Sequence, residues 1–309
     1  MSIGAYIKQI GRGARGAKGL TRAQAADLLG QVLDGQASEL EVGAFCVAMR
    51  IKGETAEEMC GFVDAAQARI ARFPAGADGR PLIVLPSYNG ARKLPVLTPL
   101  LALLLARAGQ RVLLHGMRTE SGRVVSSDVL TAFDLPALTA IKSIAPGEVA
   151  HVGTALLHPG LARLLATRET LGLRNPGHSV AKLLAPCAGP ALLVSSYTHP
   201  AYFDVLCTSF ATLGLDALLS RGLEGEPAAD PRRASRLDAF VAGAHQLLDE
   251  QQPGTASEVP GLPAAIDAAS TADYTRRVLA GELPVPAALQ RQVDHIVRLS
   301  ARITARTKT

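Results

Sequence analysis

The sequence contains few aromatic residues, with no tryptophan, seven phenylalanines and five tyrosines among 309 residues. Proteins that bind single strands by stacking bases on aromatic rings normally carry more, so base stacking is not the expected mode of binding. Hydrophobic runs are also short. The longest, residues 100–106, is far below the roughly 20 residues that a membrane-spanning helix needs. We therefore expect no membrane partner.

Cysteine is scarce and scattered. Cys46, Cys60, Cys187 and Cys207 form no CxxC pair and lie in apolar contexts. This pattern predicts reduced thiols in the core rather than disulfides or a zinc site. The first residues are basic and lack the apolar segment of a secretory signal. These features predict a cytoplasmic protein.

Acidic residues are missing from whole stretches of the chain. The net charge is +5 and the pI about 9.2, but residues 1–26 hold five cations and no acid. Residues 80–128 contain seven cations and two acids, and residues 276–309 also contain seven cations and two acids. Separated basic blocks are typical of proteins that bind a polyanion, although solvated helix faces give the same composition.

The hydrophobic pattern predicts two kinds of structure. Thr21, Ser38 and Thr55 are expected helix N-caps, so residues 1 to about 73 form helices without strands. Expected strands at 82–85, 111–115, 191–196 and 217–219 then alternate with helices at 96–108, 126–133, 158–184 and 200–213. Further helices are expected at 236–250, 271–280 and 286–305. The alternation predicts an α/β fold with a mostly parallel sheet.

One loop has the position of a phosphate site but an unusual composition. Residues 83–93, IVLPSYNGARK, predict a strand that ends at Pro86, followed by a loop and a helix. Phosphates bind at such strand–loop–helix junctions. The loop contains one glycine, and Tyr88 is the aromatic residue expected to face the cleft. It is therefore an intact phosphate pocket, a degraded one, or a loop that binds another phosphate.

Two further motifs follow in the sequence: His115, Gly116 and Arg118 match a Lys-His-Gly-Asn-Arg motif in which Leu114 replaces the lysine, and Ser126, Ser127 and Asp128 match a Ser-rich loop. These motifs resemble those of anthranilate phosphoribosyltransferases and related nucleoside phosphorylases. In LGLRNPGHSVAKLLAP, Arg174 stands where the enzymes contact anthranilate. The resemblance implies a small all-helical domain, residues 1–75 completed by about 155–185, packed on a larger α/β domain, residues 76–154 and 186–309.

The chain departs from these enzymes where they bind diphosphate and magnesium. Their Gly-Thr-Gly-Gly-Asp loop reads Ser-Tyr-Asn-Gly-Ala here, and their adjacent Asp-Glu pair is replaced by Glu224 and Glu226 around Gly225. We expect a vestigial phosphoribosyl diphosphate pocket comprising Ser87, Tyr88, Asn89, Gly90, His115, Ser126, Ser127 and Asp128. No catalytic residue is assigned and no cofactor is expected. Magnesium is expected only if transferase activity remains, with Glu224 and Glu226 as weak candidate ligands.

Three sequence segments, PSYNGARK, RNPGHSVAKLL and RGLEGEPAADPRR, resemble those of the YbiB-type paralogues of the enzyme. That resemblance implies a homodimer formed through the helical domain, nucleic-acid binding without sequence preference, and no activity on anthranilate. The candidate phosphate contacts are Lys8, Arg12, Arg15, Lys18, Arg22, Arg92, Lys93, Arg118, Arg123, Arg174 and Lys182. The glycines between residues 8 and 22 suggest a flexible path along a nucleic-acid backbone. A basic stripe in the final helix, Arg291 to Arg306, is expected to be a solvated face.

Two functions remain open at this point. The first is sequence-independent DNA binding by a non-enzymatic homodimer on a transferase-like scaffold. The alternative is a divergent phosphoribosyltransferase or glycosyl transferase that uses phosphoribosyl diphosphate and an unknown acceptor. A loop with one glycine followed by Arg92 and Lys93 favours the first function, because it suits a polymer backbone better than a diphosphate leaving group.

Overall fold

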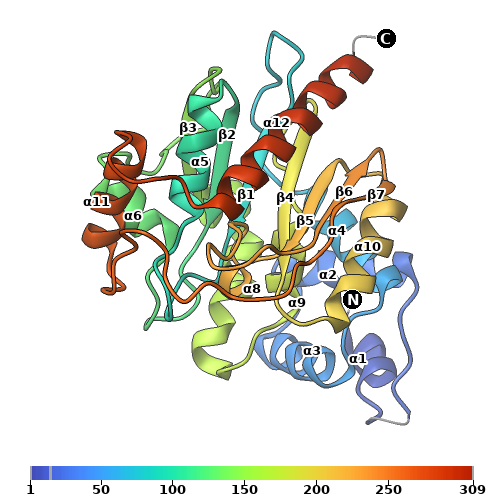
Figure 1. Ribbon diagram of the computed structural model, residues 1–309. Coiled ribbons are helices and arrows are strands. Elements are labelled where there is room, and N and C mark those ends of the chain that lie inside the picture. The colour runs from blue at the N-terminus through green and yellow to red at the C-terminus, as the bar shows by residue number, and fades with distance from the viewer. Residues whose placement is uncertain (1, 14–15, 308–309) are drawn as a thin grey trace.

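The computed structural model describes residues 2–13 and 16–307. Its centre is a seven-stranded sheet with the spatial order β3-β2-β1-β4-β5-β6-β7 (Figure 1). The strands are β1 (Leu82–Ser87), β2 (Arg111–Gly116), β3 (Val149–Gly153), β4 (Ala191–Tyr197), β5 (Ala217–Arg221), β6 (Leu237–Val241) and β7 (Ala244–Asp249). The five strands from β3 to β5 in this order pair in parallel. β6 pairs antiparallel with β5, and β7 pairs antiparallel with β6. The predicted mostly parallel sheet is confirmed.

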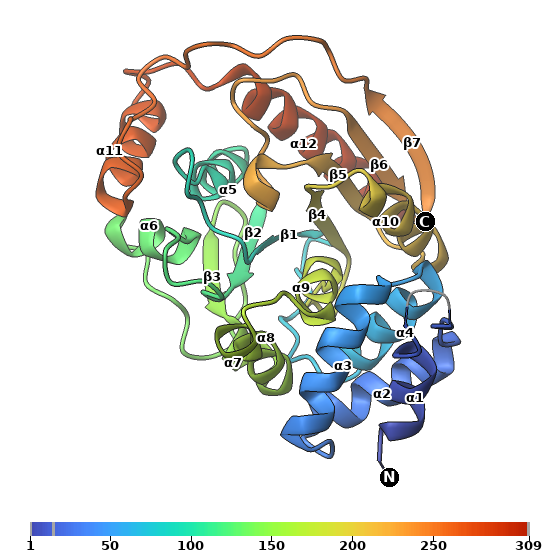
Figure 2. The ribbon, with the colours of Figure 1, turned by 90° about the horizontal axis from the view of Figure 1, so that it is seen from below.

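Helices cover both faces of the sheet because its central strands are apolar on both faces. In β1, Leu82 and Val84 belong to one core, and Ile83 and Leu85 belong to the other. The second core is closed by α5 (Thr98–Arg107), α11 (Ala268–Leu279) and α12 (Ala287–Thr307), with α6 (Ser126–Ala132) packed on α5 and α11. The first core is closed by α10 (Ala201–Leu213) and by the N-terminal helices (Figure 2).

The N-terminal region is helical, as predicted. It comprises α1 (Gly4–Ile10), α2 (Arg22–Leu33), α3 (Glu39–Lys52) and α4 (Ala56–Gln67). Thr21, Ser38 and Thr55 each cap a helix through a capping box. A helical domain packed on a mostly parallel α/β domain is therefore the observed fold.

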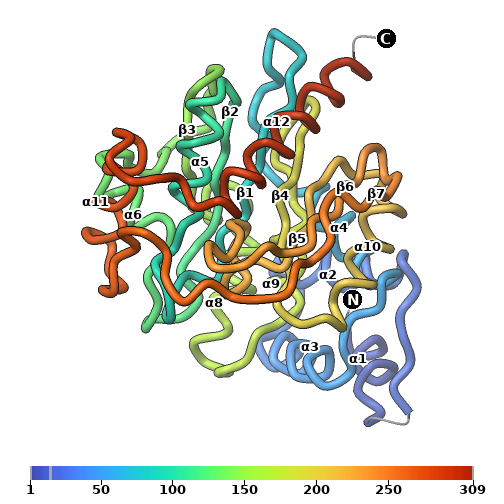
Figure 3. Tube along the Cα trace, in the orientation of Figure 1, coloured from blue at the N-terminus to red at the C-terminus, as the bar shows by residue number. Residues whose placement is uncertain are grey.

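A later helical segment separates β3 from β4 along the chain (Figure 3). It consists of α7 (Thr154–Leu157), α8 (Pro159–Leu171), α9 (Pro176–Val180) and the short 3-10 helix η1 (Ala181–Leu183). α8 packs on α2 and α3, whereas η1 packs on β1 and β4. The segment thus contacts both layers, and its assignment to one domain stays a prediction.

The predicted helix at 236–250 is wrong. These residues form the β6–β7 hairpin, whose turn residues Ala242 and Gly243 both have positive φ, +48° and +77°. Successive positive φ values are typical of the tight turns that join antiparallel strands. β6 is buried whereas β7 is largely exposed, so the segment as a whole resembles an amphipathic helix in composition.

Three smaller differences concern short elements. β3 and α1 were not predicted, since five and seven residues are too few to show a clear period. β1 continues through Pro86 to Ser87 instead of ending at the proline. β4 pairs with β1 only as far as Val84, so the missing N–H of Pro86 removes no hydrogen bond on that side.

The cysteines and helices agree with the composition. Cys46, Cys60 and Cys187 are buried free thiols, and Cys207 is a partly exposed one. Within residues 2–13 and 16–307, every helix is too short or too polar to cross a lipid bilayer. The cytoplasmic location stays a prediction.

Candidate functional site

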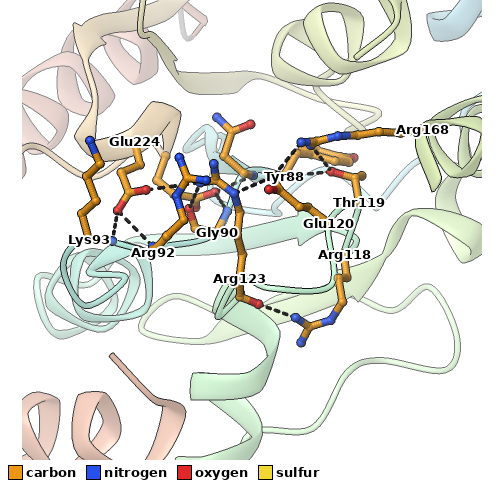
Figure 4. A network of polar contacts seen from close by, with 12 residues as sticks. Tyr88, Gly90, Arg92, Lys93, Arg118, Thr119, Glu120, Arg123, Arg168 and Glu224 are labelled. Carbon is orange, nitrogen blue, oxygen red and sulfur yellow. Dashed lines mark hydrogen bonds and ion pairs between the residues drawn. The ribbon is translucent and has the colours of Figure 1, made fainter. Parts of the chain in front are cut away.

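The candidate site lies where the strand order reverses. From β1 the chain builds outward through β2 and β3, then crosses to the other side for β4 and β5. Ligands of open α/β sheets bind at the carboxyl ends of the strands at such a point. The loops after β1, β2 and β5 are joined there by a network of polar contacts (Figure 4).

Glu226 is buried and reaches into the loop that follows β1. Its Oε1 accepts hydrogen bonds from the backbone N–H groups of Asn89 and Gly90, both at 2.8 Å. Its Oε2 accepts hydrogen bonds from the hydroxyls of Ser87 and Thr98. Adjacent backbone N–H groups and hydroxyls are the donors with which proteins bind phosphate. Here the anion that they bind is a side chain of the same protein.

Glu224 occupies a second set of donors in the same loop. Its Oε1 accepts hydrogen bonds from the backbone N–H groups of Arg92 and Lys93 at 3.0 and 2.7 Å. Its Oε2 accepts a bond from Arg123 Nη1 at 3.2 Å. Glu224 itself has a positive φ of +52°, which is uncommon for a residue with a side chain. Together the two glutamates accept hydrogen bonds from four of the five backbone N–H groups of residues 89–93.

Gly225 fixes the segment between these glutamates. Its φ is +83°, and a Cβ at this position would lie 2.0 Å from Asn89 Nδ2, so only glycine fits. Its carbonyl oxygen accepts hydrogen bonds from Lys182 Nζ at 2.9 Å and Ser196 Oγ at 2.8 Å. Burial, and then repulsion by Arg174, lower the pKa of Lys182 to about 8. The ammonium group of Lys182, a predicted phosphate contact, is thus hydrogen-bonded to a backbone carbonyl within the protein.

Tyr88 does not face the cleft, contrary to the expectation from its loop. It is buried, and its hydroxyl lies 2.8 Å from His115 Nδ1 and accepts a hydrogen bond from Thr154 Oγ1 at 3.1 Å. Burial lowers the pKa of His115 to about 4 and raises that of Tyr88. Both side chains are therefore neutral and hydrogen-bonded to each other, and neither ring is available to stack on a base.

The remaining residues of the predicted pocket line a nearly closed space. Ser126 is buried with its Oγ 2.8 Å from Ser87 Oγ, and Asp128 accepts the backbone N–H of Val125 at 3.1 Å. A cavity of about 10 Å³ lies beside Ser87, Gly116, Ser127 and His151. This space holds about one water molecule, far less than a phosphoribosyl diphosphate requires.

The donor chemistry of the two glutamates does not fit a magnesium site. Magnesium on a diphosphate requires free carboxylate oxygens in near-octahedral positions. Every carboxylate oxygen of Glu224 and Glu226 already accepts a hydrogen bond from the protein. Within residues 2–13 and 16–307, no three His, Cys, Asp or Glu side chains are close enough to hold a metal ion.

Several predicted cations form ion pairs at the rim of the site. Arg118 pairs with Asp128 at 2.6 Å and donates to the backbone carbonyl of Arg123. Arg123 and Arg168 both pair with Glu120, at 2.7 and 2.6 Å. The Arg123 bond is the main cause of the lowered pKa of Glu120. These arginines are held in place by acids of the same protein.

Three predicted cations near this rim, Arg92, Lys93 and Arg174, form no ion pair with the described residues. Arg174 is half-buried, and burial, then repulsion by Arg168 and Arg123, lower its pKa. No acceptor in the described part of the chain receives a hydrogen bond from its guanidinium. Arg92 and Lys93 are exposed, and only their backbone N–H groups are bonded to Glu224. Their side chains are free to contact an external anion.

The N-terminal cations are separated from this site. Lys8, Arg12 and Lys18 are exposed, and Arg15 lies outside the described residues. Arg22 is paired with Asp64 through two hydrogen bonds of 2.6 and 2.9 Å. The structure thus does not bring the N-terminal block together with the residues around Glu120.

The two ends of the segment that carries these cations are bonded to the rest of the protein. Lys8 lies on α1, and Gln9 Nε2 donates to the carbonyl of Gly19 at 2.8 Å. The backbone N–H of Leu20 donates to buried Glu58 at 2.9 Å. These contacts fasten residues 9 and 19–20 to the helical bundle, and the flexible path expected from the glycines between them stays a prediction.

The basic stripe of α12 behaves as the solvated face that was expected. His295 lies 3.1 Å from Asp249, and Arg302 donates to Gln246 at 2.9 Å. Arg306 forms a bidentate pair with Asp216. His295 and Arg302 thus contact β7, whereas Arg306 contacts the residue before β5.

Sequence reasoning missed three residues of the network: Thr98, Glu120 and Arg168. Thr98 is the first residue of α5 and looks like an ordinary helix start. Arg168 lies in the middle of α8, and its link to Glu120 spans 48 residues of sequence. No local pattern connects residues so far apart.

Comparisons with known proteins match nearly the whole chain. Residues 5–70 match the helical bundle domain of a glycosyl transferase family. The uncharacterized protein YbiB of Escherichia coli K12 is 38% identical over 296 residues, which cover 93% of this chain and 91% of that protein. An anthranilate phosphoribosyltransferase of a Nocardioides species is 31% identical over 280 residues, covering 85% of this chain and 78% of the relative.

Solved structures show the same fold at lower identity. The anthranilate phosphoribosyltransferase of Thermus thermophilus superposes with a TM-score of 0.71 at 20% identity, covering 98% of this chain and 90% of the other. That of Saccharomyces cerevisiae in complex with PRPP and Mg gives 0.70 at 13% identity, covering 97% and 88%. From the sequence relatives, the chain belongs to the anthranilate phosphoribosyltransferase-like family of glycosyl transferases.

Proposed function

We propose that this protein is a homodimer that binds nucleic acid, with DNA as the expected ligand, through phosphate contacts and without sequence preference. One observation carries the proposal. In the 87–93 loop the backbone N–H groups hold internal carboxylates, while the side chains of Arg92 and Lys93 are exposed and unpaired. The loop is thus closed to a small diphosphate and open to a polyanion that passes over its rim.

The distribution of charge supports the same conclusion. Lys8, Arg12 and Lys18 form a second exposed group of cations on the helical bundle. Each cation that neutralises a backbone phosphate releases a counterion, which favours binding at low salt. Tyr88 is buried, so it offers no platform on which bases could stack. The proposed contacts are to phosphates, which carry no sequence information.

A second copy of the chain is the proposed partner of the helical bundle. On α3, Leu40, Val47 and Ile51 are exposed by 84%, 37% and 70%, and they lie on one side of the helix. Val47 and Ile51 border a groove of about 500 Å³ between α1 and α3, beside Ile7 and Ala44. A two-fold dimer on this surface covers the exposed apolar side chains and doubles the number of cations that one nucleic acid can reach.

Phosphoribosyl transfer is the second candidate, because relatives at 31% identity are named anthranilate phosphoribosyltransferases. Arg174 is present and free, at the position expected to contact anthranilate. With magnesium, phosphoribosyl diphosphate and anthranilate, we expect no product above background. Turnover that disappears in Glu224→Ala would instead support the transferase.

A salt titration tests the proposal directly. Fluorescence anisotropy of duplex and single-stranded oligonucleotides, each in two unrelated sequences, is measured from about 50 to 200 mM salt. The expected result is similar affinity for the two sequences and a linear loss of log affinity with log salt. Absence of binding at about 50 mM, or binding of one sequence only, would contradict the proposal.

A further inference from the structure

The contacts of Glu224 and Glu226 extend beyond what a structural ion pair requires. Seven donors converge on the two carboxylates: four backbone N–H groups, two hydroxyls and one guanidinium group. Six of these seven donors are uncharged. Converging N–H and O–H donors of this kind form an anion-binding site, in which the anion is held by hydrogen bonds from uncharged groups.

We propose that Glu224 and Glu226 determine which anions the protein accepts, by filling this site with carboxylates of the chain itself and excluding small soluble phosphates. The inference does not depend on nucleic-acid binding. It concerns only the competition between a tethered carboxylate and a diffusing anion for the donors of the 87–93 loop.

The tether gives the internal carboxylates the advantage. A group on a short linker acts as a ligand at an effective concentration that is millimolar or higher. Here both carboxylates belong to the chain itself, and the single residue Gly225 joins the two glutamates. The carbonyl oxygen of Gly225 accepts hydrogen bonds from Lys182 and Ser196. Backbone contact is also close at Gly222, where a Cβ would lie 1.8 Å from the Glu226 carbonyl oxygen. These contacts hold the segment beside the donors of the 87–93 loop.

The position of the two carboxylates leaves the outer rim unaffected. Glu226 is buried, whereas the side chains of Arg92 and Lys93 project from the same loop to solvent. A small phosphate that reaches the rim finds exposed cations, whereas the N–H donors of the loop are already bonded to the glutamates. A polymer can bind several such cations together, which a single phosphate cannot. The glutamates thus discriminate against small phosphates without reducing polymer contacts.

Calorimetric titration with inorganic pyrophosphate in metal-free, low-salt buffer tests the proposal. The wild-type protein is compared with the double variant Glu224→Ala, Glu226→Ala. A double variant that removes two exposed acids elsewhere, Glu250→Ala with Glu258→Ala, controls for the change in net charge. We expect the cleft variant to bind pyrophosphate at least tenfold more tightly than both the wild type and the control.

Glu226→Gln provides the same test if the double alanine variant does not fold. It keeps the shape of the side chain and removes its charge, so pyrophosphate should bind it more tightly than the wild type. Equal affinity of folded cleft variants and wild type would overturn the proposal. So would an equal gain in the control, because the effect would then be general electrostatics.

Discussion

The hydroxyl of Tyr88 and Nδ1 of His115 form a hydrogen bond of 2.8 Å inside the protein. This contact turns the aromatic residue of the 87–93 loop away from the cleft and anchors the loop on β2. It also explains how a loop with one glycine keeps a phosphate-type backbone: Tyr88 fills the interior while Asn89 and Gly90 present their N–H groups to Glu226.

Tyr88→Phe should destabilise the fold without changing its shape. The change leaves His115 Nδ1 and the Thr154 hydroxyl without their buried partner, and such a loss costs about 1–3 kcal/mol. Urea unfolding of the wild type and the variant measures the difference. Tyr202→Phe, which removes a hydroxyl from a partly exposed side chain, is the matched control. An unchanged free energy of unfolding in Tyr88→Phe would show that the hydroxyl is not buried as described.

His115 should make the fold sensitive to mild acid. Its pKa in the folded protein is about 4, below the value of about 6.5 expected in the unfolded chain. Between these values the unfolded state binds more protons, so stability falls as the pH falls from 6.5 to 4. The wild type should lose more unfolding free energy over this range than His115→Gln. Parallel pH profiles of the two proteins would contradict this assignment.

The α3 surface predicts the oligomeric state. Ile51→Asp places a charge in the proposed dimer interface on a residue that is 70% exposed in the single chain. The variant should therefore fold normally but elute as a monomer, whereas the wild type should be a dimer in sedimentation experiments. Leu247→Asp, at another exposed apolar residue, should remain dimeric. A monomeric wild type would exclude the dimer.

The strands and caps that the sequence predicts well are those with strong local signals. Thr21, Ser38 and Thr55 cap helices because each is followed three residues later by Gln24, Glu41 or Glu58, which completes the box. The β6–β7 hairpin was missed because its two strands differ in burial, and its Ala-Gly turn is a weaker signal than Asn-Gly.

The site was predictable in position but not in detail. The composition of the 87–93 loop indicated a phosphate-type site with lost glycines, and the Glu-Gly-Glu sequence indicated a changed metal pair. That Glu226 occupies the loop depends on bringing together residues 136 positions apart, which only the sheet order does. The ion pair between Arg168 and Glu120, beside the unpaired Arg174, likewise has no signature in the sequence.

The most direct test of the proposed function is the salt dependence of binding by the double variant Arg92→Ala, Lys93→Ala. If each side chain neutralises one phosphate, the slope of log affinity against log salt should become shallower by about two, equally for two unrelated oligonucleotides. Arg276→Ala with Arg277→Ala, two cations already paired with Asp134 and Glu282, should leave the slope unchanged. A slope that is the same in the wild type and in Arg92→Ala, Lys93→Ala, or a loss confined to one sequence, would contradict the account.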